Sequence, residues 1–395
     1  MQIMTIKDVD LKGKRVLVRE DLNVPRDKKT RELNDDTRIR AAVPTIKYLV
    51  EQGAKVIVMS HLGRPKGEIK EELRLDKVGE RLGQYLGQKV TVATDCIGES
   101  AKACVAQMKE GDVVLLENVR FYPEEEKNDR EFSQALAAYG DIFVNDAFGT
   151  AHRAHCSTCG VGEFLPTVAG FLMDNEIKAL SHALNQSESP FVAIIGGAKV
   201  SDKIGVIENL LDKVDTIIIG GGMANTFLAA QGYNMGTSLM EKDKLDIARS
   251  LMEQAKAKGK KMLLPVDLVI APAIDAPDKA QMVTLSHIPD DMMALDIGKE
   301  TRKIYIEEIK NAHSVLWNGP MGVFEVPEFA QGTFEIAHAI AESDANSVIG
   351  GGDSVAAIQK ADLWDKIDHI STGGGASLEF LEGKTLPGIA IINQK

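Results

Sequence analysis

Basic side chains follow the apolar, β-branched segments in the first half of the chain and form a candidate site for an anion. A single arginine in such a loop more often makes a surface ion pair. Here four arginines and two histidines occur together, in a chain with 46 Lys and Arg against 58 Asp and Glu. Arginine binds phosphate or carboxylate oxygens with two parallel hydrogen bonds. The candidate residues are Asp21 and Asn23 in VREDLNVP, His61 and Arg64 in SHLGRP, Arg120 in ENVRFY, His152 and Arg153 in NDAFGTAHR, and Arg38, which opens a helical segment.

Glycine-rich loops take the place of these basic loops in the second half of the chain. They are GGAK (196–199), GGGM (220–223), NGPMG (318–322), GGGDS (350–354) and GGGAS (373–377). One such loop is explained equally well by a tight turn. Five of them indicate a backbone that must come close to a large ligand, and exposed N–H groups at helix N-termini suit phosphate oxygens.

Two lysines flank the start of a predicted helix over 201–214, which has Ser201 or Asp202 as its cap. They are Lys199 and Lys203. Positive charge at a helix N-terminus is unfavourable unless an anion lies there. The pair therefore favours a phosphate-binding role over a purely structural one.

Asp353 comes directly after a glycine triplet and is the candidate metal ligand of the chain. Mg²⁺ commonly takes one or two protein carboxylates together with the phosphates of a substrate. The same side chain is placed to cap the helix that begins there. The two roles are compatible.

Other well-known site motifs are missing or incomplete. The chain contains neither GxxxxGK[ST] nor GxGxxG, so a P-loop triphosphatase is excluded and a dinucleotide dehydrogenase loses its main support. The HxxHCxxC segment (152–159) has the residue types of a zinc site. Structural zinc draws its ligand pairs from more widely separated segments, so this spacing disfavours zinc. The CxxC within it lacks a thioredoxin-like context.

The elements that must position these residues are β-branched runs that alternate with helical patterns. This order predicts parallel strands with crossover helices, and ligands of such sheets bind at the carboxyl ends of the strands. Strands are predicted at 15–19, 55–59, 90–93, 113–117 and 141–145 in the first half, and at 191–195, 216–219, 261–265, 314–318, 347–349 and 368–370 in the second.

Two helices frame this arrangement. One is predicted over 37–52, with a kink at Pro44 and Gly53 as its C-terminal stop. The other, over 171–190, ends in a polar Ser/Pro stretch and marks the domain junction. The predicted fold class is therefore α/β, with two doubly wound, Rossmann-like parallel-sheet domains joined by a hinge helix.

The composition excludes several classes of partner. A formal charge of −12 argues against general binding to nucleic acid or anionic membranes, and 5% aromatic residues offers little for base stacking. The charged N-terminus lacks the apolar stretch of a signal peptide, and the apolar runs are far too short to span a bilayer. Four cysteines fit a reducing cytoplasm, which is the predicted location.

Eight motifs, in order and from about residue 15 to the end, resemble those of the phosphoglycerate kinase family. They are VREDLNVP, SHLGRP, ENVRFYPEEE, NDAFGTAHRAH, GGAKVSDKI, WNGPMGVFE, GGGDS and STGGGASLE. The resemblance implies reversible, Mg²⁺-dependent transfer of the acyl phosphate of 1,3-bisphosphoglycerate to ADP, which gives ATP and 3-phosphoglycerate. It also implies a phosphoglycerate-binding N-domain (1–170), an interdomain helix (171–187), a nucleotide-binding C-domain (188–375), closure about a hinge, and a tail (376–395) that packs on the N-domain.

The resemblance implies three sets of site residues. The phosphoglycerate-binding set is Asp21, Asn23, Arg38, His61, Arg64, Arg120 and Arg153. The nucleotide-binding set is Lys203, Gly298, Glu325, Gly351, Gly352, Asp353 and Ser354, with Glu325 suited to a ribose hydroxyl and Asp353 to the metal. Arg38, Lys199 and the backbone N–H of Gly373 surround the transferred phosphoryl group. No general base is needed, because the nucleophile is an anionic oxygen in both directions.

Small departures from the family pattern leave these roles intact. The 25–36 loop lacks an expected glycine, and Cys156 and Cys159 are not family residues but add sensitivity to oxidation. The expected partners are the small-molecule substrates alone, with no nucleic acid and no membrane, and the expected state is a monomer. The alternative is a two-domain protein that binds phosphorylated metabolites without chemistry, which would need no phosphoryl-binding lysines.

Overall fold

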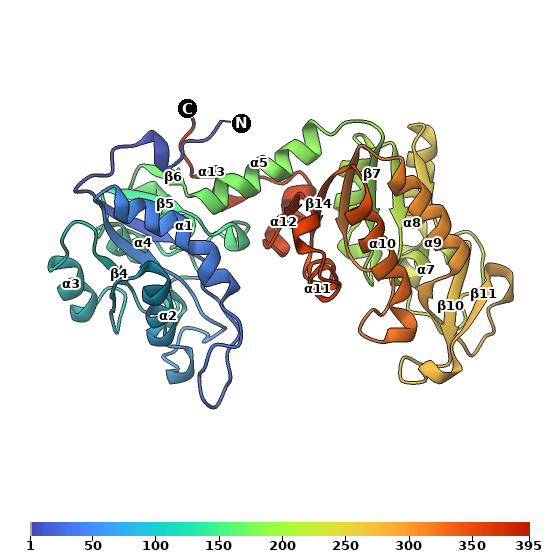
Figure 1. Ribbon diagram of the computed structural model, residues 1–395, viewed down its shortest axis with the longest axis horizontal. Coiled ribbons are helices and arrows are strands. Elements are labelled where there is room, and N and C mark those ends of the chain that lie inside the picture. The colour runs from blue at the N-terminus through green and yellow to red at the C-terminus, as the bar shows by residue number, and fades with distance from the viewer. Residues whose placement is uncertain (1) are drawn as a thin grey trace. The chain divides into compact units, whose positions relative to one another are not determined.

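The computed structural model describes residues 2–395 and divides into two compact units (Figure 1). One unit comprises the chain up to Lys178 together with Thr385–Lys395, and the other comprises Ala179–Lys384. The assignment of a phosphoglycerate-binding and a nucleotide-binding domain to particular residue ranges stays a prediction. No helix in the described part of the chain is long and apolar enough to cross a membrane.

The first unit is built on a parallel sheet with the strand order β3-β4-β2-β1-β5-β6. Its strands are β1 (Arg15–Arg19), β2 (Lys55–Met59), β3 (Val90–Val92), β4 (Val113–Leu115), β5 (Ile142–Asn145) and β6 (Thr167–Ala169). The first five confirm the predicted strands. The sixth was not predicted, because its three residues lie between Pro166 and Gly170 and carry almost no pattern.

Helices cover both faces of this sheet. Successive strand residues point to opposite faces, so apolar residues at every position of a strand need a helix layer on each side. They are α1 (Thr37–Glu51), α2 (Asp76–Leu86), α3 (Glu99–Ala106) and α4 (Arg130–Ala137). Val16 of β1 packs in one core with Ile39 of α1, whereas the neighbouring Leu17 packs in another with Phe132 of α4. The strands are therefore buried on both faces, which is why they read as continuous apolar runs.

The second unit repeats the scheme with the strand order β15-β14-β13-β7-β8-β9, again parallel. Its strands are β7 (Phe191–Ile195), β8 (Thr216–Ile219), β9 (Lys261–Leu263), β13 (Ser314–Asn318), β14 (Asn346–Gly350) and β15 (His369–Ile370). Its helices are α6 (Ile204–Leu211), α7 (Gly222–Ala230), α8 (Leu245–Ala257), α9 (Lys299–Lys310), α10 (Gln331–Glu342), α11 (Gly352–Lys360) and α12 (Gly375–Leu381). Together the two units confirm the predicted α/β class.

A second, antiparallel sheet in this unit was not predicted. It consists of β10 (Asp267–Ala271), β11 (Gln281–Thr284) and β12 (Met293–Ile297), in the order β11-β10-β12. Figure 1 shows β10 and β11 as the yellow strands beside α9. The exposed edge strand β11 has a weak apolar pattern, which explains why sequence periodicity missed it.

Helix α5 (Phe171–Asn185) begins in the first unit and ends in the second. Asp146, just after β5, accepts hydrogen bonds through Oδ1 from the backbone N–H groups of Leu172 (3.0 Å) and Met173 (3.3 Å) at the helix start. The structure has the predicted helix, and its end lies two residues before the expected 187. It ends at Asn185 in a polar segment before Pro190, where serine competes for backbone hydrogen bonds and proline disfavours a helical residue before it.

The last residues of the chain add a short helix, α13 (Pro387–Ala390), to the first unit. Asn393 donates its backbone N–H to Thr167 O (2.9 Å) and accepts from Thr167 N through Oδ1 (2.7 Å). Gly388 O accepts a hydrogen bond from Nδ2 of Asn145 at 2.8 Å. These contacts attach the tail to β5 and β6.

Candidate functional site

In the first unit, the predicted phosphoglycerate-binding side chains gather at the carboxyl ends of β1, β2, β4 and β5. Arg38 in the first turn of α1 donates from Nη1 to the carbonyl oxygen of Asn23 at 2.8 Å, and the same nitrogen lies 3.4 Å from Oδ1 of Asp21. The side chain of Asn23 in turn accepts a hydrogen bond from Gly63 N at 2.9 Å. The loop after β1 therefore connects α1 to the loop after β2.

His61 belongs to this cluster, and its side chain is buried. Its Nδ1 is 3.0 Å from Nη2 of Arg19. Because a guanidinium has no acceptor, Nδ1 must accept the hydrogen bond and the ring proton must sit on Nε2. Burial lowers the pKa of His61 well below its usual value, and the charges of Arg19, Arg120 and Arg38 lower it further. His61 is therefore a neutral hydrogen-bond donor.

The arginines of the cluster differ in burial. Arg120 is half-buried, its Nη1 donates to Gly63 O at 3.2 Å, and its Nε lies 3.6 Å from Oε1 of Glu126 in an ion pair. Burial lowers the pKa of Arg120, partly offset by Glu126 and Glu125 and lowered further by Arg153. Arg153 and Arg64 are exposed. The cluster thus offers free guanidinium donors on the surface and a partly desolvated one beneath.

Beneath these side chains lies a buried polar layer that the sequence analysis missed. Arg19 is completely buried and donates from Nε to Ser157 Oγ at 2.9 Å, and Ser157 donates to Glu125 Oε2 at 2.6 Å. Burial raises the pKa of Glu125, while the nearby charge of Arg19 lowers it. Arg19 and Glu125 can remain buried because each is paired. The one sequence signal was the charged Arg19 directly after the apolar residues of β1 (RVLVR).

Glu20 and Asp146 form a second buried pair next to the candidate site. Glu20 Oε1 and Asp146 Oδ2 are both buried and accept no hydrogen bond from the described part of the chain. Burial raises the pKa of Glu20 well above its usual value, and the neighbouring Asp146 carboxyl raises it further. Burial also raises the pKa of Asp146, which its bonds to α5 counteract. A proton held by Glu20 and shared with Asp146 satisfies both oxygens.

In the second unit, the end of β13 connects several predicted nucleotide-binding residues. Lys203 Nζ donates to Oδ1 of Asn318, and burial lowers the pKa of this lysine. Ser354 is buried and its Oγ accepts a hydrogen bond from Gly319 N at 2.7 Å. Gly351 has a φ of +94°, and a Cβ added there would lie 3.1 Å from Asn318 Nδ2.

The predicted caps of the two helices at this edge were wrong. Helix α6 begins at Ile204 after Lys203, and Ser201 instead donates to Glu241 Oε2 at 2.7 Å. Gly351 precedes α11, so Asp353 lies in its first turn and not at the cap position. A short 3-10 turn (Val200–Asp202) shifts the start of α6, which propensity alone does not reveal.

Asp353 lines a cavity of about 540 Å³ in this unit, together with Glu325. Loop glycines line one side of it and apolar side chains of the antiparallel sheet line another. The glycines include Gly197 and Gly221, and the apolar side chains include Leu268 and Leu295. Glu325 and Asp353 are both exposed, so a polar ligand can reach their carboxylates. Of the predicted nucleotide set these two line the cavity, and Lys203, Gly298, Gly351, Gly352 and Ser354 are not among the lining residues.

The glycine-rich loops fall into two groups. A Cβ at Gly196 would lie 2.1 Å from Pro320 O, and one at Gly319 would lie 2.3 Å from Gly196 O, so these glycines allow two loops to pack on each other. At Gly352 and Gly374 an added Cβ would meet no described atom within 4 Å. The backbone at these two positions leaves room for a ligand, and Gly197 and Gly221 line the cavity, whereas Gly196 and Gly319 serve the packing of one loop on another.

Three further predicted residues are placed differently. Lys199 is exposed in the loop after β7. Gly373 is buried and its N–H is 3.3 Å from Ser371 Oγ, so the N–H must leave this contact to reach a phosphoryl group. Gly298 precedes α9, where an added Cβ would lie 2.2 Å from the carboxylate of Asp267.

Residues 2–395 contain no group of three or more His, Cys, Asp or Glu side chains arranged to hold a metal ion. Cys156 is buried, and its Sγ donates to the backbone oxygens of Glu124 (3.3 Å) and Asp129 (3.2 Å). A metal held by one carboxylate and by substrate oxygens needs no such group.

The chain is similar to proteins of one family along its whole length. A family model described as phosphoglycerate kinase matches residues 6–384. Curated phosphoglycerate kinases of Moorella thermoacetica and Pelotomaculum thermopropionicum are 58% and 57% identical over 395 and 391 residues, which is 100% and 99% of each chain. The solved phosphoglycerate kinases of Coxiella burnetii (43% identity, TM-score 0.91) and Pyrococcus horikoshii (36%, 0.81) each align over 98% of both chains.

Proposed function

The chain belongs to the phosphoglycerate kinase family, and from that membership we propose which of its residues perform each part of the family's reaction. The reaction is the reversible transfer of the acyl phosphate of 1,3-bisphosphoglycerate to ADP, a step of glycolysis that gives ATP and 3-phosphoglycerate. The chain is thus an enzyme, a phosphotransferase with a carboxyl group as acceptor in the reverse direction. This replaces the alternative of a binding protein without chemistry.

The phosphoglycerate site is the basic cluster of the first unit. One observation carries this assignment: Arg38 and Arg120 donate to the backbone oxygens of Asn23 and Gly63, two residues that are themselves hydrogen-bonded. Burial lowers the pKa of His61, two residues before Gly63, and both arginines are close enough for their charges to lower it further. A phosphate and a carboxylate on one small molecule need several donors at different positions. Exposed Arg64 and Arg153, half-buried Arg120 and the Nε2–H of His61 supply them, while Asp21 and Asn23 are placed for the hydroxyl group.

The nucleotide site is the cavity of the second unit. Apolar side chains such as Leu268 and Leu295 suit a flat base, and Glu325 suits a ribose hydroxyl. The open backbone at Gly352 and the amino group of Lys203 suit phosphate oxygens. Gly351 and Ser354 support this end through Asn318 and Gly319, and Gly298 supports the other end by its close approach to Asp267.

The residues of this site also fit Mg²⁺. Asp353 offers one exposed carboxylate beside the same cavity, and this suits an ion that completes its shell with substrate phosphates and water. When bound, the ion would neutralise charge on the phosphates. Lys203 is close enough for the charge of Asp353 to raise its pKa against the effect of burial, so the carboxylate and the amino group share one electrostatic environment.

The chemistry needs charge neutralisation and alignment, not a proton relay. The attacking oxygen is an anion in both directions, so the oxygens of the migrating phosphoryl group must be held and their charge stabilised. Arg38, Lys199 and the N–H of Gly373 are the groups we assign to this task. Arg38 and Lys199 are exposed and therefore available.

The test is ATP-dependent phosphorylation of 3-phosphoglycerate with Mg²⁺, coupled to NADH oxidation through glyceraldehyde-phosphate dehydrogenase. We expect a signal that needs ATP, 3-phosphoglycerate and Mg²⁺ together. Calorimetric titration with each substrate separately checks the two sites. If Arg120→Ala leaves the Kd for 3-phosphoglycerate unchanged, the basic cluster is not the phosphoglycerate site. A cytoplasmic location and a monomeric state remain predictions.

A further inference from the structure

The side chain of Asn118 joins three backbone segments around the phosphoglycerate site. Its Oδ1 accepts hydrogen bonds from Leu62 N (3.2 Å) and Arg120 N (3.1 Å), and its Nδ2 donates to Leu62 O (2.8 Å) and Leu73 O (3.0 Å). Asn118 is completely buried. All four hydrogen-bonding positions of the amide are therefore used, with no position left for water or ligand.

The segments that Asn118 joins carry the proposed donors. Leu62 stands between His61 and Arg64 in the loop after β2, and Arg120 is in the loop after β4. A backbone hydrogen bond from Val119 N to Ser60 O (3.2 Å) joins the same two loops. Bonds from Gly67 N to Arg120 O (3.2 Å) and from Arg120 Nη1 to Gly63 O (3.2 Å) also join the two loops. The Asn118 amide adds two buried bonds to Leu62 between His61 and Arg64, and it connects this pair of loops to Leu73.

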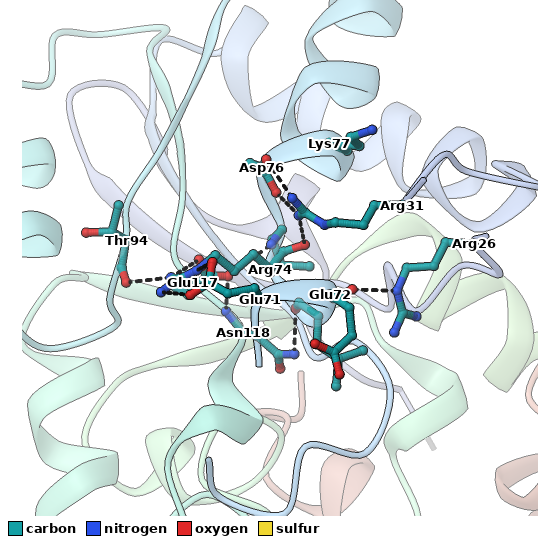
Figure 2. A network of polar contacts seen from close by, with 12 residues as sticks. Arg26, Arg31, Glu71, Glu72, Arg74, Asp76, Lys77, Thr94, Glu117 and Asn118 are labelled. Carbon is teal, nitrogen blue, oxygen red and sulfur yellow. Dashed lines mark hydrogen bonds and ion pairs between the residues drawn. The ribbon is translucent and has the colours of Figure 1, made fainter. Parts of the chain in front are cut away.

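An ion pair between the buried Glu117 and the partly exposed Arg74 holds Asn118 in turn, as Figure 2 shows around Arg74. Glu117 is 2% exposed, and its Oε1 accepts from Asn118 N (2.9 Å) and Leu75 N (3.0 Å). Its Oε2 is 3.1 Å from Nη1 of Arg74. Bonds to Glu71 and Glu117 raise the pKa of Arg74 above its usual value. The carboxylate accepts from two backbone N–H groups and from Arg74, so it fixes the backbone from which the Asn118 side chain extends.

We propose that Asn118 is a positioning residue for phosphoglycerate binding: its amide holds the His61–Arg64 loop at the correct distance from Arg120. The inference rests on the proposed phosphoglycerate site. Asn118 has no free polar atom and does not touch the substrate. It acts on affinity through the placement of the two loops, because anion donors that move by about 1 Å lose much of their effect.

The experiment compares Asn118→Ala with Asn118→Ser in the full-length enzyme. Asn118 is also the cap of a short 3-10 turn (Val119–Phe121) through its bond to Arg120 N. Serine is a good cap and keeps that bond, but it is too short to reach Leu62 and Leu73. Both variants should therefore raise the Kd and KM for 3-phosphoglycerate by about tenfold, as expected for lost buried hydrogen bonds. The KM for Mg·ATP should stay within about twofold, since Asn118 lies in the other unit.

A matched control is Asn393→Ala. This substitution removes a 2.7 Å bond to Thr167 N at the opposite edge of the same sheet, and it should leave the KM for 3-phosphoglycerate unchanged. The proposal is overturned if serine restores wild-type affinity, if both variants bind 3-phosphoglycerate normally, or if the KM values for both substrates rise together. If alanine prevents folding, the serine variant decides by the same criteria. Arg120→Ala distinguishes a wrong role for Asn118 from a wrong binding site. If the proposed site itself is wrong, Arg120→Ala will also leave the Kd for 3-phosphoglycerate unchanged.

Discussion

Arg19 Nη2 lies 3.0 Å from Nδ1 of His61, and this contact fixes the protonation state of the histidine. A guanidinium only donates, so Nδ1 accepts and His61 stays neutral with its proton on Nε2. The other cations of the cluster act in the same direction, because Arg120 and Arg38 also lower the pKa of His61. The basic cluster therefore contains one neutral donor among its arginines.

His61 should make the stability of the enzyme sensitive to acid. Its pKa is well below the usual value near 6.5 in the folded state, so the unfolded chain takes up a proton first as the pH falls through 6.5. The free energy of unfolding that this residue contributes is present above that pH and is lost below it. His61→Gln should flatten the pH dependence of urea unfolding between pH 6.5 and 5. An unchanged profile would show that the histidine is charged in the native enzyme.

Arg38→Ala should abolish most turnover without unfolding the protein. A preorganised charge at a migrating group contributes about 10²–10³ in rate. The side chain is 43% exposed and its ion pair with Asp21 is long, at 3.4 Å, so its loss should cost less than about 1 kcal/mol of stability. The coupled assay and thermal unfolding measure the two quantities. Arg40→Ala, on the same helix with a partner at Asp36, is the control. Turnover near that of the wild type in Arg38→Ala would remove Arg38 from the phosphoryl site.

Glu20→Gln should stabilise the protein increasingly as the pH rises. The folded-state pKa of Glu20 is raised well above the usual value, so the folded protein retains a proton that the unfolded chain loses above about pH 4.5. The contribution of Glu20 to the free energy of unfolding is fully present below that pH and declines as the pH rises towards the folded pKa. Glutamine keeps a donor for Asp146 without the proton. Urea unfolding of both proteins from pH 4 to 8 tests this, with the exposed Glu131→Gln as control. Parallel curves for wild type and Glu20→Gln would contradict it.

Two glycines of the second unit should respond in opposite ways to alanine. Gly352 has open space at its Cβ position and begins α11, so Gly352→Ala should leave the melting temperature unchanged. If this backbone contacts phosphate, the substitution should weaken Mg·ADP binding by about tenfold, because one charge-assisted hydrogen bond contributes about that much affinity. Gly319 has a φ of +103° and a Cβ position 2.3 Å from Gly196 O, so Gly319→Ala should cost at least about 2 kcal/mol. Calorimetry and thermal unfolding distinguish the two effects. Normal Mg·ADP binding by Gly352→Ala would exclude contact at that position.

Asp353→Asn should impair the use of Mg²⁺ more than the binding of the nucleotide. Loss of the only proposed protein ligand should raise the Mg²⁺ concentration for half-maximal activity by about tenfold. The Kd for ADP without Mg²⁺ should not rise, since a carboxylate does not attract phosphate. Titration of activity with Mg²⁺ and calorimetry with free ADP measure these effects. Equal Mg²⁺ requirements in both proteins would assign the ion to another ligand.

The strand pattern and most of the candidate site were accessible from the sequence. Buried parallel strands leave continuous β-branched runs, and the residues that follow such strands meet at one sheet edge. Asp21, Asn23, His61 and Arg120 were found in this way, and the structure brings them together. The sheet β10 to β12 was not found. Its edge strand β11 is exposed and has a weak apolar pattern, but β10 is as long and as buried as the predicted strands, so its DLVIA segment carries a sequence signal that was overlooked.

The tertiary structure alone decided how the site residues are held and charged. The sequence does not show that Arg19 is buried against His61, that the carboxyl groups of Glu20 and Asp146 are buried beside each other, or that the amide of Asn118 joins the loops after β2 and β4. These contacts link residues 42 to 126 positions apart. Burial and partner charge determine pKa values and hydrogen-bond roles, and both are properties of the packed chain. The sequence by itself determined which residues lie at the carboxyl ends of the strands, because the position of a strand along the chain and the residues that follow it are local properties. The protonation of those residues and the distances between them depend on packing, which only the folded chain has.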